Sequence, residues 1–172
     1  MLLMRKSLLL IVSSVLAVAA MGVLSAGPAS ATESSGDTSM CVDNFAVGEF
    51  DCAWANGVGQ PVGMYPLTGN TTNWYIPVSG WGEIRQAGTN RCMQLNHSAG
   101  DVIQEETCSG ASYQMFKRYY FSTATYIYIS EWAPYLCLTY NQSHQILDMV
   151  TCPYHNGVFA PGYAPWYQRI LD

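Results

Sequence analysis

Charged side chains are scarce in this 172-residue chain, in which Asp, Glu, Lys and Arg together make up only 11% of the residues. Beyond the first 31 residues the only adjacent basic pair is Lys117-Arg118, and acidic residues outnumber basic ones. A protein that grips phosphate backbones or anionic lipid surfaces needs clustered Lys and Arg. We therefore expect no nucleic-acid partner and no attraction to anionic membranes.

Recognisable catalytic and metal-binding motifs are also lacking. The chain contains no G-x-S-x-G, no H-E-x-x-H and no C-x2-C pair. Its three histidines, His97, His144 and His155, stand in polar, turn-like contexts where a lone imidazole is usually solvated. The adjacent acidic pair Glu105-Glu106 would point to opposite faces of a strand. We predict a non-enzymatic protein without a metal or cofactor, and keep a small secreted hydrolase as a third hypothesis because a fold never excludes chemistry.

The only long hydrophobic run lies at the N-terminus. Arg5 and Lys6 precede a stretch from Ser7 to Val23 that is mostly Leu, Val, Ala and Ile, and Ala-Ser-Ala follows at 29–31. A basic start, an apolar core and an A-x-A end are the three parts of a secretory signal peptide. The apolar stretch is short for a membrane span, so a retained N-terminal anchor is the lesser alternative. We expect residues 1–31 to be a signal peptide and the mature chain to be secreted and extracellular, with no stable membrane insertion.

All six cysteines follow this segment, and an even number of cysteines in an exported chain indicates three disulfides. Residues 32–40 are small and polar, and we expect a flexible leader there. From residue 41 onward we find no convincing amphipathic helix, and short β-rich runs such as 73–76 and 125–129 alternate with Gly, Pro, Asn and Ser clusters. Many short strands with closely spaced turns favour an all-β sandwich or barrel over 41–172.

Two segments of this β-rich part repeat each other. Cys92 and Cys108 are 16 residues apart, and Cys137 and Cys152 are 15 residues apart. In each segment an Ile stands eight residues before the first cysteine, and an aromatic residue follows the second. This agreement predicts one disulfide within each segment.

A third copy lies upstream, with one cysteine missing. It begins at Cys52 and has Leu67 in the place of the second cysteine, followed by Gly69 and Trp74 in register. The spare Cys41 stands 11 residues before Cys52, so we predict that these two pair. Three copies around an axis bury apolar faces that one copy could not, which predicts a pseudo-threefold all-β barrel. We expect the ring near the end of each copy to lie in the core: Trp74, Phe116 and Trp166.

The best-preserved copy runs Cys92-Met93-Gln94, then Val102-Ile103-Gln104 and Cys108, then Gln114-Met115-Phe116. It resembles the repeat of ricin B-type β-trefoil lectins, which reads C-L-D, a strand, a second cysteine, Gly and Q-x-W. The resemblance covers about 41–172. It implies a β-trefoil fold with three pseudo-repeats, and binding of galactose- or xylose-type sugars in shallow pockets, one per repeat.

In that family a carboxylate two residues after the first cysteine grips sugar hydroxyls, a ring two residues before the second cysteine covers the sugar face, and amides fix orientation. The carboxylate position holds Trp54, Gln94 and Thr139 in the three copies, and the ring position holds Tyr65, Glu106 and Val150. The family's amide positions hold glutamines in the second copy. The ligand-binding residues that the resemblance implies are Gln94, Gln104, Gln114 and Tyr65. The alternative is that Gln104 and Gln114 hydrogen-bond turns and cap strands, and that Tyr65 is an exposed strand residue.

Two functions from different classes therefore compete. The leading hypothesis is a secreted, non-enzymatic carbohydrate-binding module whose partner is a glycan or polysaccharide. The alternative is a secreted protein-interaction or inhibitor domain that uses the trefoil as a scaffold and its loops, above all residues 153–165, as the contact surface. Missing sugar ligands favour the second hypothesis, and the threefold cysteine and aromatic pattern favours the first.

Overall fold

The chain folds almost entirely into β-strands. The computed structural model describes residues 38–44, 49–67, 72–96, 98–122, 125–152, 154–155, 158–159 and 166–170. These ranges contain one short 3-10 helix, η1 (Ser112–Gln114), and no helix long and apolar enough to cross a membrane. The strands are β1 (Thr38–Asn44), β2 (Glu49–Trp54), β3 (Gly63–Pro66), β4 (Trp74–Tyr75), β5 (Trp81–Glu83), β6 (Arg85–Gln86), β7 (Arg91–Gln94), β8 (Gln104–Thr107), β9 (Met115–Ser122), β10 (Thr125–Ser130), β11 (Leu136–Asn141), β12 (Ile146–Thr151), β13 (Tyr154–His155), β14 (Val158–Phe159) and β15 (Trp166–Ile170).

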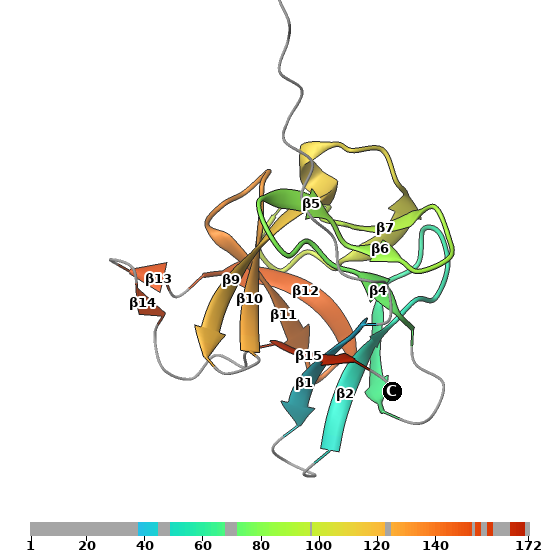
Figure 1. Cartoon of the computed structure of the whole chain (residues 1–172), viewed down its shortest axis with the longest axis horizontal. Coiled ribbons are helices and arrows are strands. Elements are labelled where there is room, and N and C mark those ends of the chain that lie inside the picture. Colours follow the sequence, from blue (N-terminus) through green and yellow to red (C-terminus); the bar gives the residue numbers. More distant parts are fainter. Residues whose placement is uncertain are drawn as a thin grey trace, which may run out of the picture.

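Thirteen of these strands form one antiparallel sheet that follows the order β5-β9-β10-β11-β12-β3-β2-β1-β4-β6-β7-β8. Strand β15 lies off this path and pairs with both β1 and β10, so it links the first and last copies. Figure 1 shows three groups of strands around a common centre: β1–β4, β5–β8 and β9–β12. The all-β fold class predicted from the sequence is confirmed.

The three groups meet in a closed triangle of backbone hydrogen bonds. The Val62 amide donates to the Ile103 carbonyl at 2.9 Å, the Ile103 amide to the Leu147 carbonyl at 2.9 Å, and the Leu147 amide to the Val62 carbonyl at 3.0 Å. One residue comes from each copy, and all three are fully buried. The pseudo-threefold arrangement predicted from the repeats is therefore present in the backbone itself.

A second set of three hydrogen bonds surrounds this triangle. In each bond the donor lies two residues after one triangle residue, and the acceptor lies two residues before another. The amide-to-carbonyl pairs are Met64 to Gln145 (2.8 Å), Glu105 to Gln60 (2.9 Å) and Met149 to Asp101 (3.1 Å). The copies are thus joined by backbone hydrogen bonds, and a side-chain substitution does not remove the groups that form them.

The three predicted disulfides are confirmed: Cys41–Cys52, Cys92–Cys108 and Cys137–Cys152. Cys41 lies directly opposite Cys52 across β1 and β2, with a Cα–Cα distance of 4.0 Å. The first disulfide therefore joins neighbouring strands, whereas the other two close the ends of their own hairpins.

Leu67 occupies the place of the missing cysteine. Its amide donates to the Phe50 carbonyl at 2.8 Å, just as the Cys108 amide donates to Asn90 at 3.1 Å and the Cys152 amide to Tyr135 at 2.7 Å. In each copy the acceptor stands two residues before the first cysteine. The backbone geometry of the first copy is thus retained without its second cysteine.

The flexible leader predicted over 32–40 is wrong for its last three residues. Strand β1 begins at Thr38, and Thr38, Ser39 and Met40 are all buried. Strand β15 pairs with Thr38, Ser39 and Met40, β4 pairs with Thr38, and Met40 packs in the hydrophobic core. Small polar side chains suit such a covered strand because its stability comes from paired backbone groups. Residues 32–37 and the predicted signal peptide, residues 1–31, lie outside the described residues.

The repeated rings lie in the core where the structure describes them. Trp74 and Phe116 are fully buried, which confirms two of the three predictions. Trp74 also donates its indole N–H to the Ala53 carbonyl at 3.2 Å. The side chain of Trp166 lies outside the described residues, as does most of the loop predicted over 153–165.

Ile103→Ala should destabilise the protein strongly, because it removes a fully buried side chain beside the central triangle. We expect the free energy of unfolding to fall by about 2–5 kcal/mol. Val58→Ala is the control, since Val58 is exposed and its substitution should change stability by less than about 0.5 kcal/mol. Equilibrium unfolding in urea measures both, and equal losses would contradict the central role of Ile103.

Candidate functional site

The position two residues after the first cysteine, where the resemblance implied a carboxylate, lies at an equivalent place on each of three hairpins: β2–β3, β7–β8 and β11–β12. In each hairpin the residue two after the first cysteine lies directly opposite the residue four before the second cysteine position. The pairs are Trp54 with Gly63, Gln94 with Gln104, and Thr139 with Asp148. Residues directly opposite each other in an antiparallel pair share one face of the sheet. Each hairpin therefore presents a two-residue platform, and the three platforms differ completely in chemistry.

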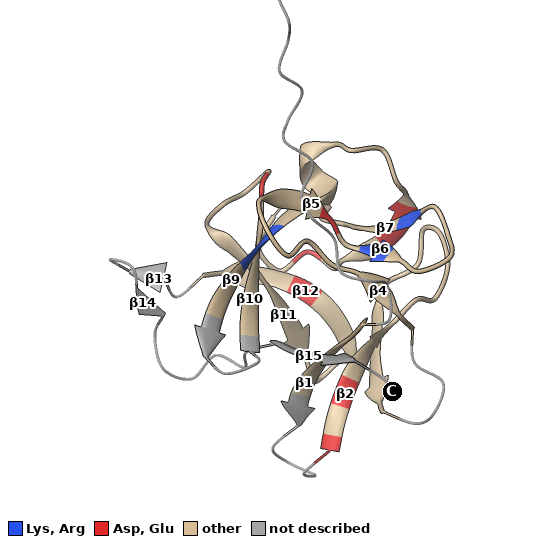
Figure 2. Ribbon diagram, viewed as in Figure 1, with Lys and Arg blue, Asp and Glu red and all other residues tan. Residues whose placement is uncertain are grey.

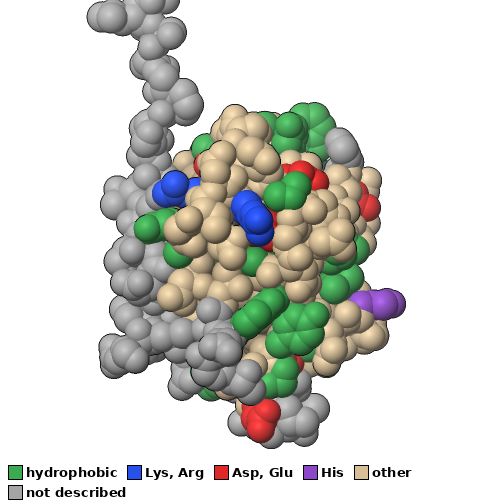
Figure 3. Space-filling model, turned by 90° about the vertical axis from the view of Figure 1, so that its right-hand side faces the viewer, with side chains coloured by type: hydrophobic (Ala, Val, Ile, Leu, Met, Phe, Trp, Pro, Cys, Tyr) green, Lys and Arg blue, Asp and Glu red, His purple; other side chains and the backbone are tan. Residues whose placement is uncertain are grey.

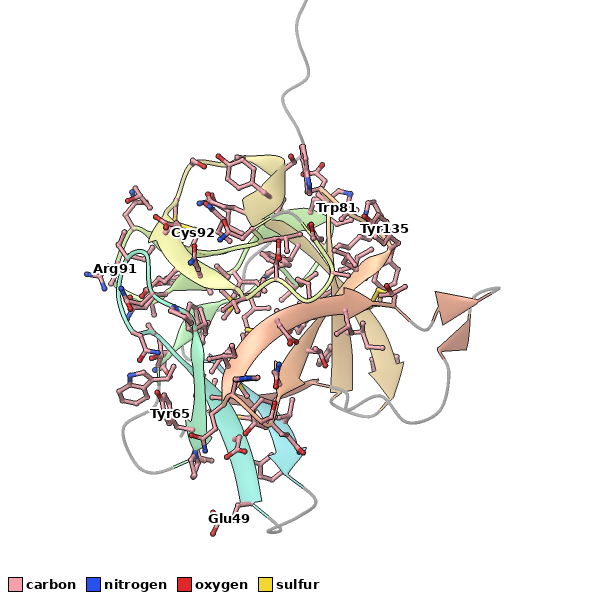
Figure 4. All side chains as sticks on the ribbon, turned by 180° about the vertical axis from the view of Figure 1, so that it is seen from behind. Glu49, Tyr65, Trp81, Arg91, Cys92 and Tyr135 are labelled. Atoms are coloured by element: carbon pink, nitrogen blue, oxygen red, sulfur yellow. A yellow bond between two sulfur atoms is a disulfide. The ribbon has the colours of Figure 1, made fainter. Side chains whose placement is uncertain are left out.

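The first platform is aromatic. Tyr65 is 42% exposed, and its ring meets the half-buried Trp54 ring edge to face, with centroids 6.4 Å apart. A Cβ on Gly63 would collide with the Tyr65 ring and would lie 2.9 Å from the Asn56 amide nitrogen. Because Gly63 has no side chain, the Tyr65 ring can fold across the strand. Figure 4 shows Tyr65 beside β3 at the surface, well away from Cys92 of the second hairpin.

The second platform consists of amides. Gln94 and Gln104 are half-buried and opposite each other, so the structure brings these two predicted residues together. Gln94 accepts from the Gln114 amide at 3.0 Å, and Gln104 accepts from the Asn96 amide at 3.1 Å. The ring position of this copy holds the half-buried Glu106. Tyr65 lies on a different hairpin, so the four predicted residues do not form one site.

Gln114 is held by hydrogen bonds within the second copy. It is buried, and besides Gln94 its amide nitrogen donates to the Thr107 carbonyl at 2.9 Å. Its oxygen accepts from the Ser109 amide at 2.7 Å and from the Ser109 hydroxyl at 2.8 Å. Both donors and both acceptor sites of the side chain are thereby used. Thr72, two residues before Trp74, caps the first copy in a similar way by accepting from the Ala55 amide at 3.0 Å.

One asparagine recurs in all three copies and was not identified from the sequence, although its constant distance from the first cysteine could have revealed it. Asn56, Asn96 and Asn141 each stand four residues after the first cysteine of their copy. Each side-chain amide donates within its own hairpin: Asn56 to the Pro61 carbonyl (2.9 Å), Asn96 to Gln104 (3.1 Å) and Asn141 to Asp148 (2.9 Å). Asn96 and Asn141 each hydrogen-bond a residue of their own platform, whereas Asn56 hydrogen-bonds the loop that leads into β3.

The third platform carries the carboxylate of Asp148, which the sequence analysis also missed. Asp148 is only 7% exposed, and burial raises its pKa above the ordinary value of 3.8, against the opposing effects of the Asn141 hydrogen bond and of His144. On the opposite face of β11, Tyr140 donates its hydroxyl to Asp51 at 2.8 Å. Burial and this carboxylate raise the pKa of the Tyr140 hydroxyl.

Three of the described basic side chains lie against aromatic rings. Arg85 lies over the Tyr75 ring at 4.7 Å and Arg118 over the Tyr126 ring at 4.3 Å. Lys117 lies between two rings, 5.8 Å from Trp81 and 5.1 Å from Tyr119. Arg91 is 4.0 Å from the buried Glu105 carboxylate. Figure 2 shows the few basic residues in two places, on β9 and on the neighbouring β6 and β7, and the described residues contain no larger basic patch.

The one metal-like cluster among the described residues is Glu83 with Cys92 and Cys108. Both sulfurs belong to a disulfide, so neither can act as a thiolate ligand. Glu83 instead accepts a hydrogen bond from the Gly110 amide at 2.8 Å. This cluster is therefore a structural part of the second copy.

No protein-family model and no curated protein matches the chain. Among solved structures, the designed 3-fold symmetric protein ThreeFoil is similar, with a TM-score of 0.62 and 12% sequence identity over 78% of this chain and 99% of that chain. The likeness shows the fold: the protein is a β-trefoil, stapled by three disulfides. The finer resemblance to ricin B-type lectins is not shown by this comparison.

Gln114→Ala should lower stability more than Gln104→Ala does. The first substitution removes a buried side chain that makes hydrogen bonds to Gln94, Thr107 and Ser109, which costs about 1–3 kcal/mol, whereas the second removes one hydrogen bond of a half-buried side chain, worth about 1 kcal/mol. Urea unfolding of both variants provides the measurement. An equal or larger loss with Gln104→Ala would contradict the structural role of Gln114.

The stability of Asp148→Asn relative to the wild type should rise with pH. Because folding raises the pKa of Asp148, the stability that its carboxyl contributes is present below the ordinary value of 3.8 and is lost as pH rises through the folded value. The neutral amide has no such loss. Unfolding in urea at about pH 3 and about pH 7 tests this, and a difference that stays constant or shrinks with rising pH would contradict it.

Proposed function

We propose that this protein is a secreted, non-enzymatic carbohydrate-binding module, similar in mode to ricin B-type lectins. The observation that supports this most is the first platform, where an exposed Tyr65 ring braced by Trp54 lies beside the Asn56 amide. An aromatic ring can cover the apolar face of a sugar while a neighbouring amide engages its hydroxyls. Tyr65 occupies the ring position that the resemblance implied.

The surroundings of this platform suit an uncharged ligand. Tyr65 lies on the side of the molecule that Figure 3 faces, where hydrophobic side chains gather in patches on a surface that is mostly uncharged. Acidic residues outnumber basic ones, with 12 Asp and Glu against 7 Lys and Arg in the chain, so an anionic ligand would gain little electrostatic attraction. A neutral sugar is thus favoured over an acidic one.

Export of the chain is part of the proposal. Three disulfides indicate folding in an oxidising environment, and the N-terminal segment has the composition of a signal peptide. A secreted trefoil with a shallow aromatic platform would bind each sugar weakly. Contact through more than one repeat would raise its avidity for a polysaccharide.

Tyr65→Ala should weaken binding to neutral glycans about tenfold, equivalent to about 1.4 kcal/mol, because it removes the exposed ring of the platform. The test is binding of the oxidised protein to arrayed glycans and insoluble polysaccharides. Tyr120→Ala is the matched control, since Tyr120 is 67% exposed but lies on β9. No binding across the panel would reject the proposed function, and equal binding by both variants would reject the Tyr65 platform.

A protein-interaction domain is the second candidate, favoured by the loop between β10 and β11. Trp132 is 53% exposed there and Tyr135 is 62% exposed, and exposed Trp and Tyr are enriched in protein interfaces. Figure 4 shows Tyr135 at the surface on the same side of the picture as Trp81 and away from Tyr65. If the glycan panel is silent, this loop is the surface with which to search for an extracellular partner.

A further inference from the structure

Glu105 departs from the threefold pattern of the core. It stands three residues before the second cysteine position of its copy, a place that Met64 and Met149 occupy in the other two copies. All three side chains are fully buried, but only Glu105 brings a carboxyl group with it. A buried carboxylate costs free energy that an apolar side chain of similar volume does not. The second copy therefore carries a costly residue at a position where methionine fits twice.

The polar groups of Glu105 are directed at the loop between β2 and β3 of the first copy. Its side-chain oxygen Oε2 accepts from the Gly57 amide at 2.7 Å. Its carbonyl accepts from the Gly59 amide at 2.7 Å, and its own amide donates to the Gln60 carbonyl at 2.9 Å. Bonds of the two backbone kinds recur in other copies, so the carboxylate bond to Gly57 is what Glu105 adds.

The loop of the first copy has few ways to hold itself in place. Gly57 and Gly59 have φ values of 110° and 74°, and glycine loses more conformational freedom than any other residue when it is fixed. In the second copy the corresponding loop supplies its own carboxylate, because Asp101 accepts from the Ser98 amide at 2.6 Å. Residues 57–60 include no carboxylate and no hydroxyl. A carboxylate from the neighbouring copy supplies the missing acceptor.

The same loop carries Asn56, the amide of the first platform. Asn56 directly precedes Gly57, and its side-chain nitrogen donates to the Pro61 carbonyl at 2.9 Å. That nitrogen would lie 2.9 Å from a Cβ on Gly63, the residue across which the Tyr65 ring folds. The position of Asn56 beside the ring therefore depends on where the loop is held.

We propose that Glu105 is a positioning residue for the first platform, although it lies too deep to touch a ligand. Its carboxylate holds the Gly57 amide, and the loop thereby keeps Asn56 beside the Tyr65 ring. Arg91 lies 4.0 Å from the same oxygen and gives this buried carboxylate a basic neighbour. One platform is thus completed by two copies. This inference rests on the proposed carbohydrate-binding function.

Glu105→Met is the deciding variant, because it installs the side chain that the other two copies carry and removes the acceptor for Gly57. Binding of the oxidised protein to arrayed neutral glycans and insoluble polysaccharides should weaken at least about fivefold, since fewer molecules have the loop in place at any moment. The midpoint of urea unfolding should stay equal or rise, because an apolar side chain replaces a buried carboxylate. Glu105→Gln keeps an oxygen acceptor and should bind within about twofold of the wild type.

Glu83→Met is the matched control. Glu83 also accepts a hydrogen bond from a glycine amide, that of Gly110 at 2.8 Å. It lies on β5, the strand of Trp81, which Figure 4 shows well away from Tyr65. This substitution removes a carboxylate–amide bond of the same kind and should leave glycan binding unchanged.

Amide hydrogen exchange tests the contact between Glu105 and Gly57 without any ligand. In the wild type the Gly57 amide should exchange slowly although Val58 beside it is exposed, because the carboxylate binds it. In Glu105→Met it should exchange about tenfold faster or more, as for the loss of a hydrogen bond to a charged group. The Gly110 amide should not change in this variant.

The outcomes separate this inference from the proposed function. Silence of the wild type across the panel rejects the proposed function and the positioning role with it. If the wild type binds, equal binding by Glu105→Met overturns the positioning role and leaves the proposed function standing. Loss of stability together with binding, without recovery in Glu105→Gln, also overturns it, since that is the pattern of a purely structural residue. If Glu105→Met fails to fold, exchange in the wild type decides, and a rapidly exchanging Gly57 amide overturns the inference.

Discussion

The structure depends on three backbone hydrogen bonds that close on themselves at the centre of the molecule. Each of Val62, Ile103 and Leu147 donates to one of the other two and accepts from the third, so no copy can complete its share alone. Three further backbone hydrogen bonds, two residues away along each strand, also join one copy to the next. A single copy would leave these polar groups unpaired in a buried site, which explains why the fold needs all three copies at once.

Because the symmetry resides in the backbone, the side chains on the three hairpins were free to diverge. The same cross-strand position pairs an aromatic ring with glycine, two amides, or a hydroxyl with a carboxylate. The asparagine four residues after each first cysteine is common to all three and ties each platform to its own turn. The trefoil therefore offers three equivalent locations with three distinct chemistries.

Much of the fold could be predicted from the spacing of the cysteines and the positions of the aromatic rings. Because spacing along the chain repeats with the fold, it predicted all three disulfides, the all-β class, and the burial of Trp74 and Phe116. The start of β1 could not be predicted in this way, since Thr38 and Ser39 look like leader residues until β15 pairs with both of them and β4 pairs with Thr38. Asp148 was missed for a related reason. Its importance comes from a cross-strand register with Thr139, and composition does not reveal register.

Gln114 and Asp148 show that two equally buried polar side chains can differ in how completely they are hydrogen-bonded. Both side chains are more than nine-tenths buried, yet Gln114 satisfies every donor and acceptor with fixed partners, and Asp148 leaves one oxygen unpaired. A saturated buried amide rigidifies the turn around it, and a ligand would have to break existing bonds to reach it. An unsaturated buried carboxylate destabilises the fold, because its oxygen has lost its hydration without gaining a hydrogen-bond partner. Gln114 of the second copy therefore acts as a brace for the fold, because each of its donors and acceptors is bound to a neighbouring residue.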